Sequence, residues 1–271
     1  MEKKRMRNYV ISSYLVFWAM VLGICGTASM VFHCRPVVMR ILSNVCAWSP
    51  TIVLLCGIRY FSPETTIRQF YKKAFAGKVS ILRLFLAALL TMGATVSTVV
   101  LLSLIQGKPF GSYWALGAYP LWASFLFSVT TGPTGEEAGW RGYVRSYLNK
   151  KYSFYKASIF QGLIWSFWHT VLWFVDSDFL GWDMIPYVLS NVIVMTSLCF
   201  MINTFMEGND NLLYGIVIHF CFNILYCFLQ VDIWFYVVLI VVYGLIAGVI
   251  CVRRKYLNLD EKNVHKMLNR N

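Results

Sequence analysis

The stretch VSILRLFLAALLTMGATVSTVVLLSLIQ, residues 79–106, decides the fold class of this chain. Arg83 is its only charged residue. About 20 consecutive apolar residues are enough for a helix to cross the hydrocarbon core of a bilayer. A helix also satisfies its backbone hydrogen bonds within one segment, which the absence of water in the bilayer requires. The stretch therefore predicts a transmembrane helix.

Comparable apolar segments recur along the whole chain, which has 271 residues, of which 58% are hydrophobic and 13% charged. Soluble domains carry about 25% charged residues, so this chain has too few to cover a water-soluble globule. We expect an all-α, polytopic bundle that forms a single integral membrane domain over residues 1–271, with short basic tails at 1–8 and 253–271. The apolar pattern predicts about eight spans, at 9–32, 37–58, 79–106, 113–131, 155–175, 185–206, 211–230 and 231–252.

Most of the Lys and Arg residues cluster at the N-terminus, at 59–83, at 141–156 and in the C-terminal tail. Under the positive-inside rule these segments are cytoplasmic, so both termini are expected on that side of a cell membrane. The net charge of +12 then reflects orientation and contact with lipid headgroups, and we expect no nucleic-acid partner. Arg35, Arg40 and Lys108 lie outside these clusters.

Few ionisable side chains fall inside the predicted spans. Glu136 and Glu137 lie near the end of the fourth span, His169 in the fifth and His219 in the seventh. Such side chains are costly at bilayer depth, so they are candidates for a functional site. Asn223 follows His219 by four residues, which places both on one face of a helix.

Helical spacing separates the two carboxylates. Glu137 and Arg141 are four residues apart and can pair, whereas Glu136 is turned about 100° away from Glu137. A carboxylate kept from water can act as a general base near neutral pH. A histidine can position a water molecule and carry a proton, and a histidine with an amide can donate hydrogen bonds to an oxyanion. This inventory favours hydrolysis of a peptide bond by activated water.

Each feature alone also has a structural interpretation. The Glu–Arg pair can hold a helix end, and a lone histidine can be a packing residue. A His–Asn pair can bond neighbouring helices, as polar side chains commonly do in membranes. The combination of all these groups in one apolar chain is what favours a functional site over a structural one.

Three motifs resemble those of the CAAX protease and bacteriocin-processing family of intramembrane endopeptidases, also called the Abi family. The first, EExxxR, is Glu136–Arg141. The second, FxxxH, is Trp165–His169, with Trp165 in place of the usual Phe. The third, HxxxN, is His219–Asn223. The resemblance covers about residues 113–230, and the form of the first motif is similar to that of the bacterial branch.

The resemblance implies a role for each motif residue. Glu136 would activate the water and His169 would help to hold it. His219 and Asn223 would form the oxyanion site, while the pair of Glu137 and Arg141 would organise these groups. The implied partners are a peptide or membrane-protein substrate and the lipid bilayer; the oligomeric state stays open.

Two alternatives accompany this interpretation. Two histidines and a glutamate could in principle hold zinc, although we favour a glutamate-based mechanism without a cofactor. A non-catalytic membrane protein, such as an immunity or scaffold protein, could bind a peptide partner in the same cavity. A transporter is disfavoured because the chain has no paired halves with interrupted helices.

Overall fold

The computed structural model of the chain describes residues 1–117, 119–175 and 179–268, with side chains up to Leu257. These residues form helices and no strand, which confirms the all-α prediction. The elements in chain order are α1 (Glu2–Met20), the π-helix η1 (Val21–Cys25), α2 (Gly26–Met30), α3 (Pro36–Ala47), α4 (Ser49–Cys56), α5 (Ile58–Phe61), α6 (Ile67–Ala74), α7 (Ile81–Gln106), the 3-10 helix η2 (Phe110–Tyr113), α8 (Leu121–Thr130), α9 (Pro133–Glu137), the π-helix η3 (Ala138–Arg145), α10 (Ser146–Lys151), α11 (Phe154–Trp168), α12 (Thr170–Val175), the 3-10 helix η4 (Gly181–Asp183), α13 (Met184–Met206), α14 (Leu213–Tyr226) and α15 (Ile233–Leu268).

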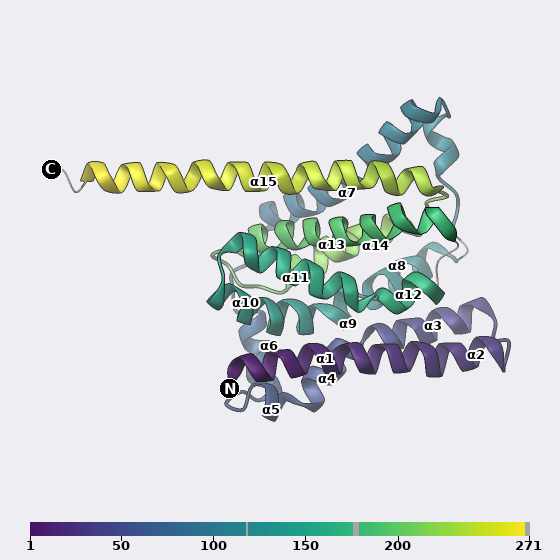
Figure 1. The fold of residues 1–271 in the computed structure, drawn as a ribbon, viewed down its shortest axis with the longest axis horizontal. Helices are drawn as coiled ribbons and strands as arrows, with labels where there is room; N and C mark the ends of the chain where they lie inside the picture. The colour runs from purple at the N-terminus through teal and green to yellow at the C-terminus, as the bar shows by residue number, and fades with distance from the viewer. Residues whose placement is uncertain (118, 176–178, 269–271) are drawn as a thin grey trace.

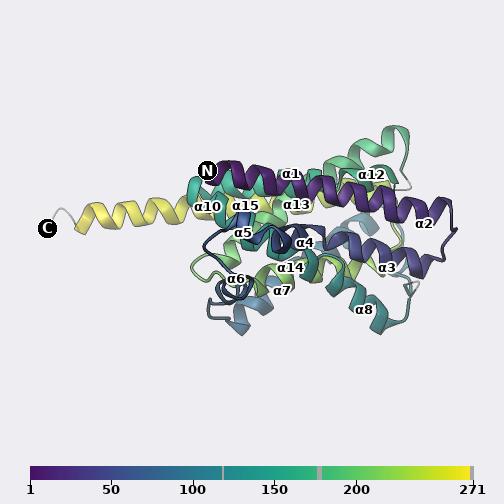
Figure 2. The ribbon, with the colours of Figure 1, turned by 90° about the horizontal axis from the view of Figure 1, so that it is seen from below.

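The helices form a bundle in which α1 to α4 lie along one side and α7 and α15 along the other (Figure 1). The segments that carry the three sequence motifs, α9, α11 and α14, lie between these two sides. The end of α15 projects beyond the bundle in both views (Figures 1 and 2). The motifs are therefore held in the interior, with helices on both sides of them.

Four helical segments of the described chain are long and apolar enough to cross a membrane. They are Glu2–Met30, Ile81–Gln106, Gly181–Met206 and Ile233–Leu257. A fifth is reached if α3 and α4, which are bent by 40° at their junction, count as one span. The chain is thus a helical membrane protein, but the eight-span count is not confirmed, and the orientation of the termini stays a prediction.

The remaining expected spans correspond to shorter helices. Helix α8 has 10 residues, α11 has 15 and α14 has 14. Each is shorter than the ~20 residues that a spanning helix needs. The apolar sequence continues beyond these helices, but the backbone turns there, and apolar composition alone does not report such breaks.

One of these breaks corrects the predicted position of the two glutamates. Helix α8 ends at Thr130, Gly132 has φ 148°, and α9 begins at Pro133. Glycine tolerates a positive φ that other residues avoid, and the fixed φ of proline suits the first position of a helix. Glu136 therefore lies in the first turn of a new helix and not near the end of the preceding span.

A buried polar network fixes the helix that follows the glutamates. Arg145, which is 5% exposed, donates from Nε to Oδ1 of Asn203 at 2.7 Å and from Nη1 to Oδ1 of Asp210 at 2.7 Å. Asn203 in turn donates from Nδ2 to Ser158 Oγ at 2.8 Å. These bonds tie η3 to α11, α13 and the connection after α13. The motif-bearing helices are thereby held in one arrangement.

A second polar contact joins α15 to the end of α13. Both terminal nitrogens of Arg254 donate to the carboxylate of Glu207. The guanidinium also lies over the ring of Phe154, 3.9 Å from its centroid. Glu207 lies just outside the spanning part of α13. The hydrogen bonds from Arg254 lower the pKa of the Glu207 carboxyl below the ordinary value for Glu.

Replacing Glu207 with Gln is expected to lower thermal stability at pH 7. A carboxyl whose pKa is lower in the folded state stabilises that state above its unfolded pKa, about 4.3 for Glu. This contribution is lost as the pH falls through the pKa of the folded protein. The unfolding midpoints of the two proteins, followed by tryptophan fluorescence in detergent, should therefore differ at pH 7 and converge at an acidic pH below the pKa of the carboxyl in the folded protein. A difference that stays the same at both pH values would refute this role.

Candidate active site

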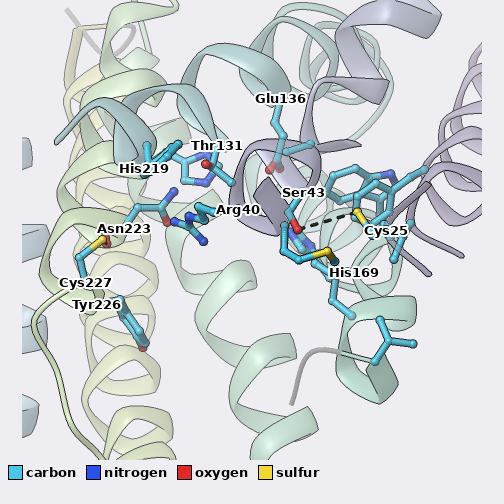
Figure 3. Close-up of a pocket in the computed structure, with 18 of the residues that line it drawn as sticks. Cys25, Arg40, Ser43, Thr131, Glu136, His169, His219, Asn223, Tyr226 and Cys227 are labelled. Atoms are coloured by element: carbon cyan, nitrogen blue, oxygen red, sulfur yellow. Dashed lines mark hydrogen bonds between the residues drawn. The ribbon is translucent and has the colours of Figure 1, made fainter. Parts of the chain in front are cut away.

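A cavity of about 850 Å³ is lined by residues of α1, η1, α2, α3, α8, α9, α11, α12, α13 and α14. Its wall includes Glu136, His169, His219 and Asn223, which come from α9, the end of α11, and α14 (Figure 3). The four residues with expected chemical roles therefore border one space, although they are spread over almost 90 residues of sequence. The rest of the wall is mainly apolar.

Glu136 is hydrogen-bonded through both its side chain and its backbone. Its Oε2 accepts a hydrogen bond from Trp165 Nε1 at 2.6 Å, and its backbone N donates to Gly132 O at 2.7 Å. The residue is 3% exposed. Sequence reasoning treated Trp165 as an aromatic replacement for Phe, and it missed that the indole N–H supplies a hydrogen bond that Phe lacks. The orientation of Glu136 thus depends on the residue by which this chain departs from the family motif.

His169 follows the last residue of α11, where the helix ends. Its Nδ1 lies 2.9 Å from Trp165 O. A carbonyl oxygen can only accept, so Nδ1 donates in this contact, and in the neutral ring Nε2 is left as an acceptor. An acceptor nitrogen in the wall of the cavity can bind a water hydrogen. Trp165 therefore positions both Glu136, through its indole, and His169, through its backbone.

Glu137 points away from Glu136 and pairs with two other groups. Its Oε1 lies 3.0 Å from Arg141 Nη1 and 2.9 Å from His219 Nδ1. Both Glu137 and Arg141 are almost completely buried. The predicted Glu137–Arg141 pair is thus present, and the structure adds a contact to His219 that spacing along the chain does not report. The arrangement connects α9, η3 and α14.

The contact with Glu137 also constrains the chemistry of His219. An ionised carboxylate accepts from Nδ1–H, so His219 Nε2 can donate to another group only when both ring nitrogens carry hydrogen. The side-chain amide of Asn223 has two N–H donors in any state. Of these two residues, Asn223 is therefore the permanent donor for an oxyanion.

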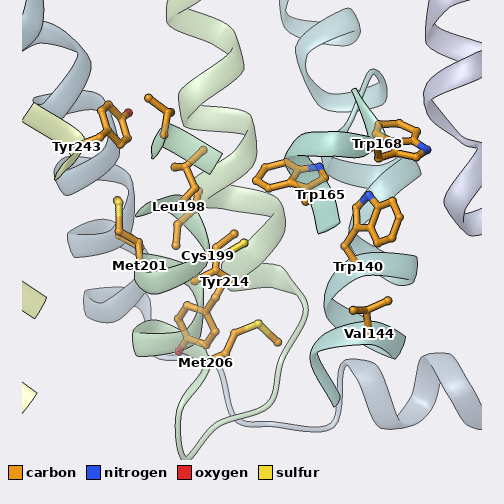
Figure 4. Packing of buried hydrophobic residues seen from close by; sticks show 14 of the residues in the cluster. Trp140, Val144, Trp165, Trp168, Leu198, Cys199, Met201, Met206, Tyr214 and Tyr243 are labelled. Atoms are coloured by element: carbon orange, nitrogen blue, oxygen red, sulfur yellow. The ribbon is translucent and has the colours of Figure 1, made fainter. Parts of the chain in front are cut away.

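Trp165 belongs to the buried hydrophobic cluster, in which it lies on the side of Trp140 and Trp168 (Figure 4), and its ring also contacts the polar groups of the site. The Arg141 guanidinium lies over its ring, 3.9 Å from the centroid. The rings of His219 and His169 meet it edge-on, at centroid distances of 5.0 and 6.0 Å. A cation over an indole face is a favourable arrangement. The side chain of Trp165 therefore contacts the Arg141 guanidinium, the Glu136 carboxylate and both histidines.

Gly132 is a second residue that sequence reasoning missed. A Cβ atom at this position would lie 2.6 Å from His219 Nε2 and 3.2 Å from Asn223 Nδ2. The backbone of the break therefore passes directly against the two candidate oxyanion residues. The Gly-Pro pair at residues 132–133 was the available signal, since it marks a turn, but it does not report which side chains lie beside the turn.

The expected zinc alternative can be tested against the donor groups of the site. Among the described side chains, those of residues 1–117, 119–175 and 179–257, no three His, Cys, Asp or Glu form a group that could hold a metal ion. A catalytic zinc site uses three such protein ligands. The histidines and Glu136 do not fit that arrangement, and no step below is assigned to a metal.

Two comparisons relate the chain to known proteins. Residues 118–225 match the family model described as type II CAAX prenyl endopeptidase Rce1-like. The chain is also 28% identical over 170 residues to CAAX prenyl protease 2 of Methanococcus maripaludis. This alignment covers 58% of the present chain and 60% of the relative. All six residues of the expected site lie within the matched segment.

Proposed function

Because residues 118–225 match the Rce1-like CAAX endopeptidase family model, we propose that the chain is an intramembrane endopeptidase of this kind. Its substrate is a membrane-associated peptide or protein, and its place of action is the cell membrane. The observation that carries the proposal is the single cavity bordered by Glu136, His169, His219 and Asn223 among apolar helices. A carboxylate, two imidazoles and an amide around one space provide a base, a water site and oxyanion donors.

In the proposed reaction Glu136 takes a proton from a water molecule while the water oxygen attacks the carbonyl carbon of the substrate. His169 Nε2 accepts a hydrogen bond from the other O–H of this water, which keeps that hydrogen, and thereby orients the water. The carbonyl oxygen becomes an oxyanion that accepts hydrogen bonds from Asn223 and from protonated His219. The proton held by Glu136 then passes to the leaving nitrogen, the C–N bond breaks, and the carboxylate of Glu136 is restored.

Glu137 and Arg141 act in this proposal without touching the reacting atoms. Glu137 orients His219 through the contact at Nδ1. Arg141 balances the charge of Glu137 and supports the ring of Trp165. Both are positioning residues, and their substitution is expected to disturb His219 and Glu136 together.

The test uses purified protein in lipid vesicles with a library of membrane peptides, with products identified by mass spectrometry. We expect the wild type to generate fragments, and both Glu136→Ala and His169→Ala to generate far fewer. Cleavage at the wild-type rate by both variants would overturn the proposal.

Cleavage is also expected to continue in the presence of a strong metal chelator. The proposed mechanism relies on a carboxylate base and on hydrogen-bond donors, and none of its steps uses a metal. The initial rate before and after prolonged dialysis against chelator is the measurement. Loss of activity that added zinc restores would show that the glutamate mechanism is wrong.

Trp165→Phe keeps an aromatic ring at the site, removes the N–H donor to Glu136 and makes the ring smaller. A hydrogen bond to a charged group contributes about 1.5–3 kcal/mol, so kcat is expected to fall by about tenfold or more. KM should change little, because Glu136 is misoriented while the apolar walls stay. Trp122→Phe, at an exposed position on α8, is the control. An unchanged kcat for Trp165→Phe would contradict the positioning role.

A further inference from the structure

Arg40 is a charged residue of the cavity to which the proposed reaction gives no task. It lies on α3 and lines the cavity together with Glu136, His219 and Asn223 (Figure 3). It is also one of the few basic residues outside the four basic clusters of the sequence. Among the described residues that line the cavity, it is the only Lys or Arg.

The partners of Arg40 set it apart from the other interior arginines. Arg141 pairs with Glu137 and Arg145 with Asp210. Within the described part of the chain, the Arg40 side chain makes no hydrogen bond or ion pair, and its guanidinium carbon lies 5.7 Å from the ring centroid of Phe127. A guanidinium has five N–H donors, and a cation without an anionic partner in a mainly apolar wall is costly. Such a cation is suited to an anion that arrives with a ligand.

Arg40 lies on α3 one helical turn from Asn44, which is bonded to the segment that precedes Gly132. Asn44, one turn further, donates from Nδ2 to Oγ1 of Thr130 at 2.7 Å and to Oγ1 of Thr131 at 2.9 Å. Thr131 directly precedes Gly132, the residue that lies against His219 and Asn223. One helical turn rises about 5.4 Å, and an extended peptide advances about 3.3 Å per residue. A substrate carbonyl at Asn223 would therefore bring a group a few residues away within reach of Arg40.

We propose that Arg40 is a specificity-determining residue that binds a carboxylate of the substrate a few residues from the scissile bond. This inference rests on the proposed endopeptidase function and specifies the substrates it favours. Guanidinium and carboxylate can form two parallel N–H···O bonds, which fix orientation as well as charge. The carboxylate belongs either to an Asp or Glu side chain or to the free C-terminus of the substrate.

The experiment uses apolar peptides in matched forms, with Asp or Asn at each position near the cleavage site, and with a C-terminal acid or amide. Cleavage by wild type, Arg40→Gln, Arg40→Lys and Arg35→Gln is compared in phosphatidylcholine vesicles. The wild type should favour the acidic form by about tenfold in kcat/KM. Arg40→Gln should reduce this ratio to about one, and Arg40→Lys should retain part of it. Arg35, which is exposed at the start of α3 and does not line the cavity, provides the control with an unchanged ratio.

The Asp and Asn pairs and the acid and amide pairs show which carboxylate Arg40 recognises. Binding of the same peptides, labelled with a fluorophore, is measured in parallel with Glu136→Gln and with the double variant that adds Arg40→Gln. If the peptides with a carboxylate bind more tightly than their amide counterparts, but neither the wild type nor any variant cleaves them, the endopeptidase function is refuted and the carboxylate site stands. A wild type without acid preference in cleavage and binding, or a preference that Arg40→Gln retains, would overturn the carboxylate site. The comparison is repeated in vesicles that contain anionic lipid. An effect of Arg40→Gln confined to those vesicles would also overturn the carboxylate site, because Arg40 would then bind a lipid headgroup.

Discussion

Replacing Glu136 with Gln is expected to lower kcat by about 10³-fold, within the range typical of the loss of a general base. The amide oxygen of Gln can still accept the hydrogen bond from Trp165 Nε1, so the side chain should keep its place. It cannot take a proton from water under these conditions. KM should therefore change far less than kcat, which separates loss of the base from loss of substrate binding.

The matched control for this change is Glu64→Gln, at an exposed position outside the helices. It removes a carboxylate of the same kind without touching the cavity and should cleave at the wild-type rate. Thermal unfolding of all three proteins establishes that each is folded. A folded Glu136→Gln variant with kcat within a factor of a few of the wild type would remove Glu136 from the reaction.

Gly132→Ala is expected to produce the second large effect, although it changes no chemical group of the site. The backbone at residue 132 has φ 148°, and forcing a non-glycine residue into such a conformation costs about 1–3 kcal/mol. The new Cβ would also meet His219 Nε2 at 2.6 Å. His219 and Asn223 must then move, and a displacement of about 1 Å in a catalytic site can lower the rate by about 10²-fold.

Gly93→Ala serves as the control, because a Cβ at that position of α7 meets no atom within 4 Å. We expect Gly93→Ala to keep both activity and the unfolding midpoint, and Gly132→Ala to lose activity and some stability. The comparison of kcat and midpoint for the two variants is the measurement. Wild-type kcat in Gly132→Ala would show that the close approach of the break to His219 has no catalytic importance.

The sequence was sufficient for the fold class and for the pairing of Glu137 with Arg141. Apolar segments such as residues 79–106 report burial in lipid directly. The spacing of Glu137 and Arg141 reports their pairing, because helical geometry relates residues four apart. Both features depend on neighbours along the chain, which is why one sequence is enough to predict them.

The contacts that cross between helices could not be predicted in the same way. The hydrogen bond from Trp165 to Glu136 joins α11 to α9, and the contact of Glu137 with His219 joins α9 to α14. The break at Gly132 was hidden because apolar composition continues through it. Arg40 was noted only as a charge outside the basic clusters, since its place in the cavity depends on how α3 packs beside α8.

The most direct test of the central claim, attack by water activated by Glu136, is a single-turnover cleavage in H₂¹⁸O that is quenched with acid and analysed by mass spectrometry. The account predicts one ¹⁸O atom in the new C-terminal carboxylate of the product and enzyme of unchanged mass at every time point. It also predicts far less labelled product from Glu136→Gln over the same time. Product without the label, or enzyme heavier by the mass of an acyl fragment, would contradict it.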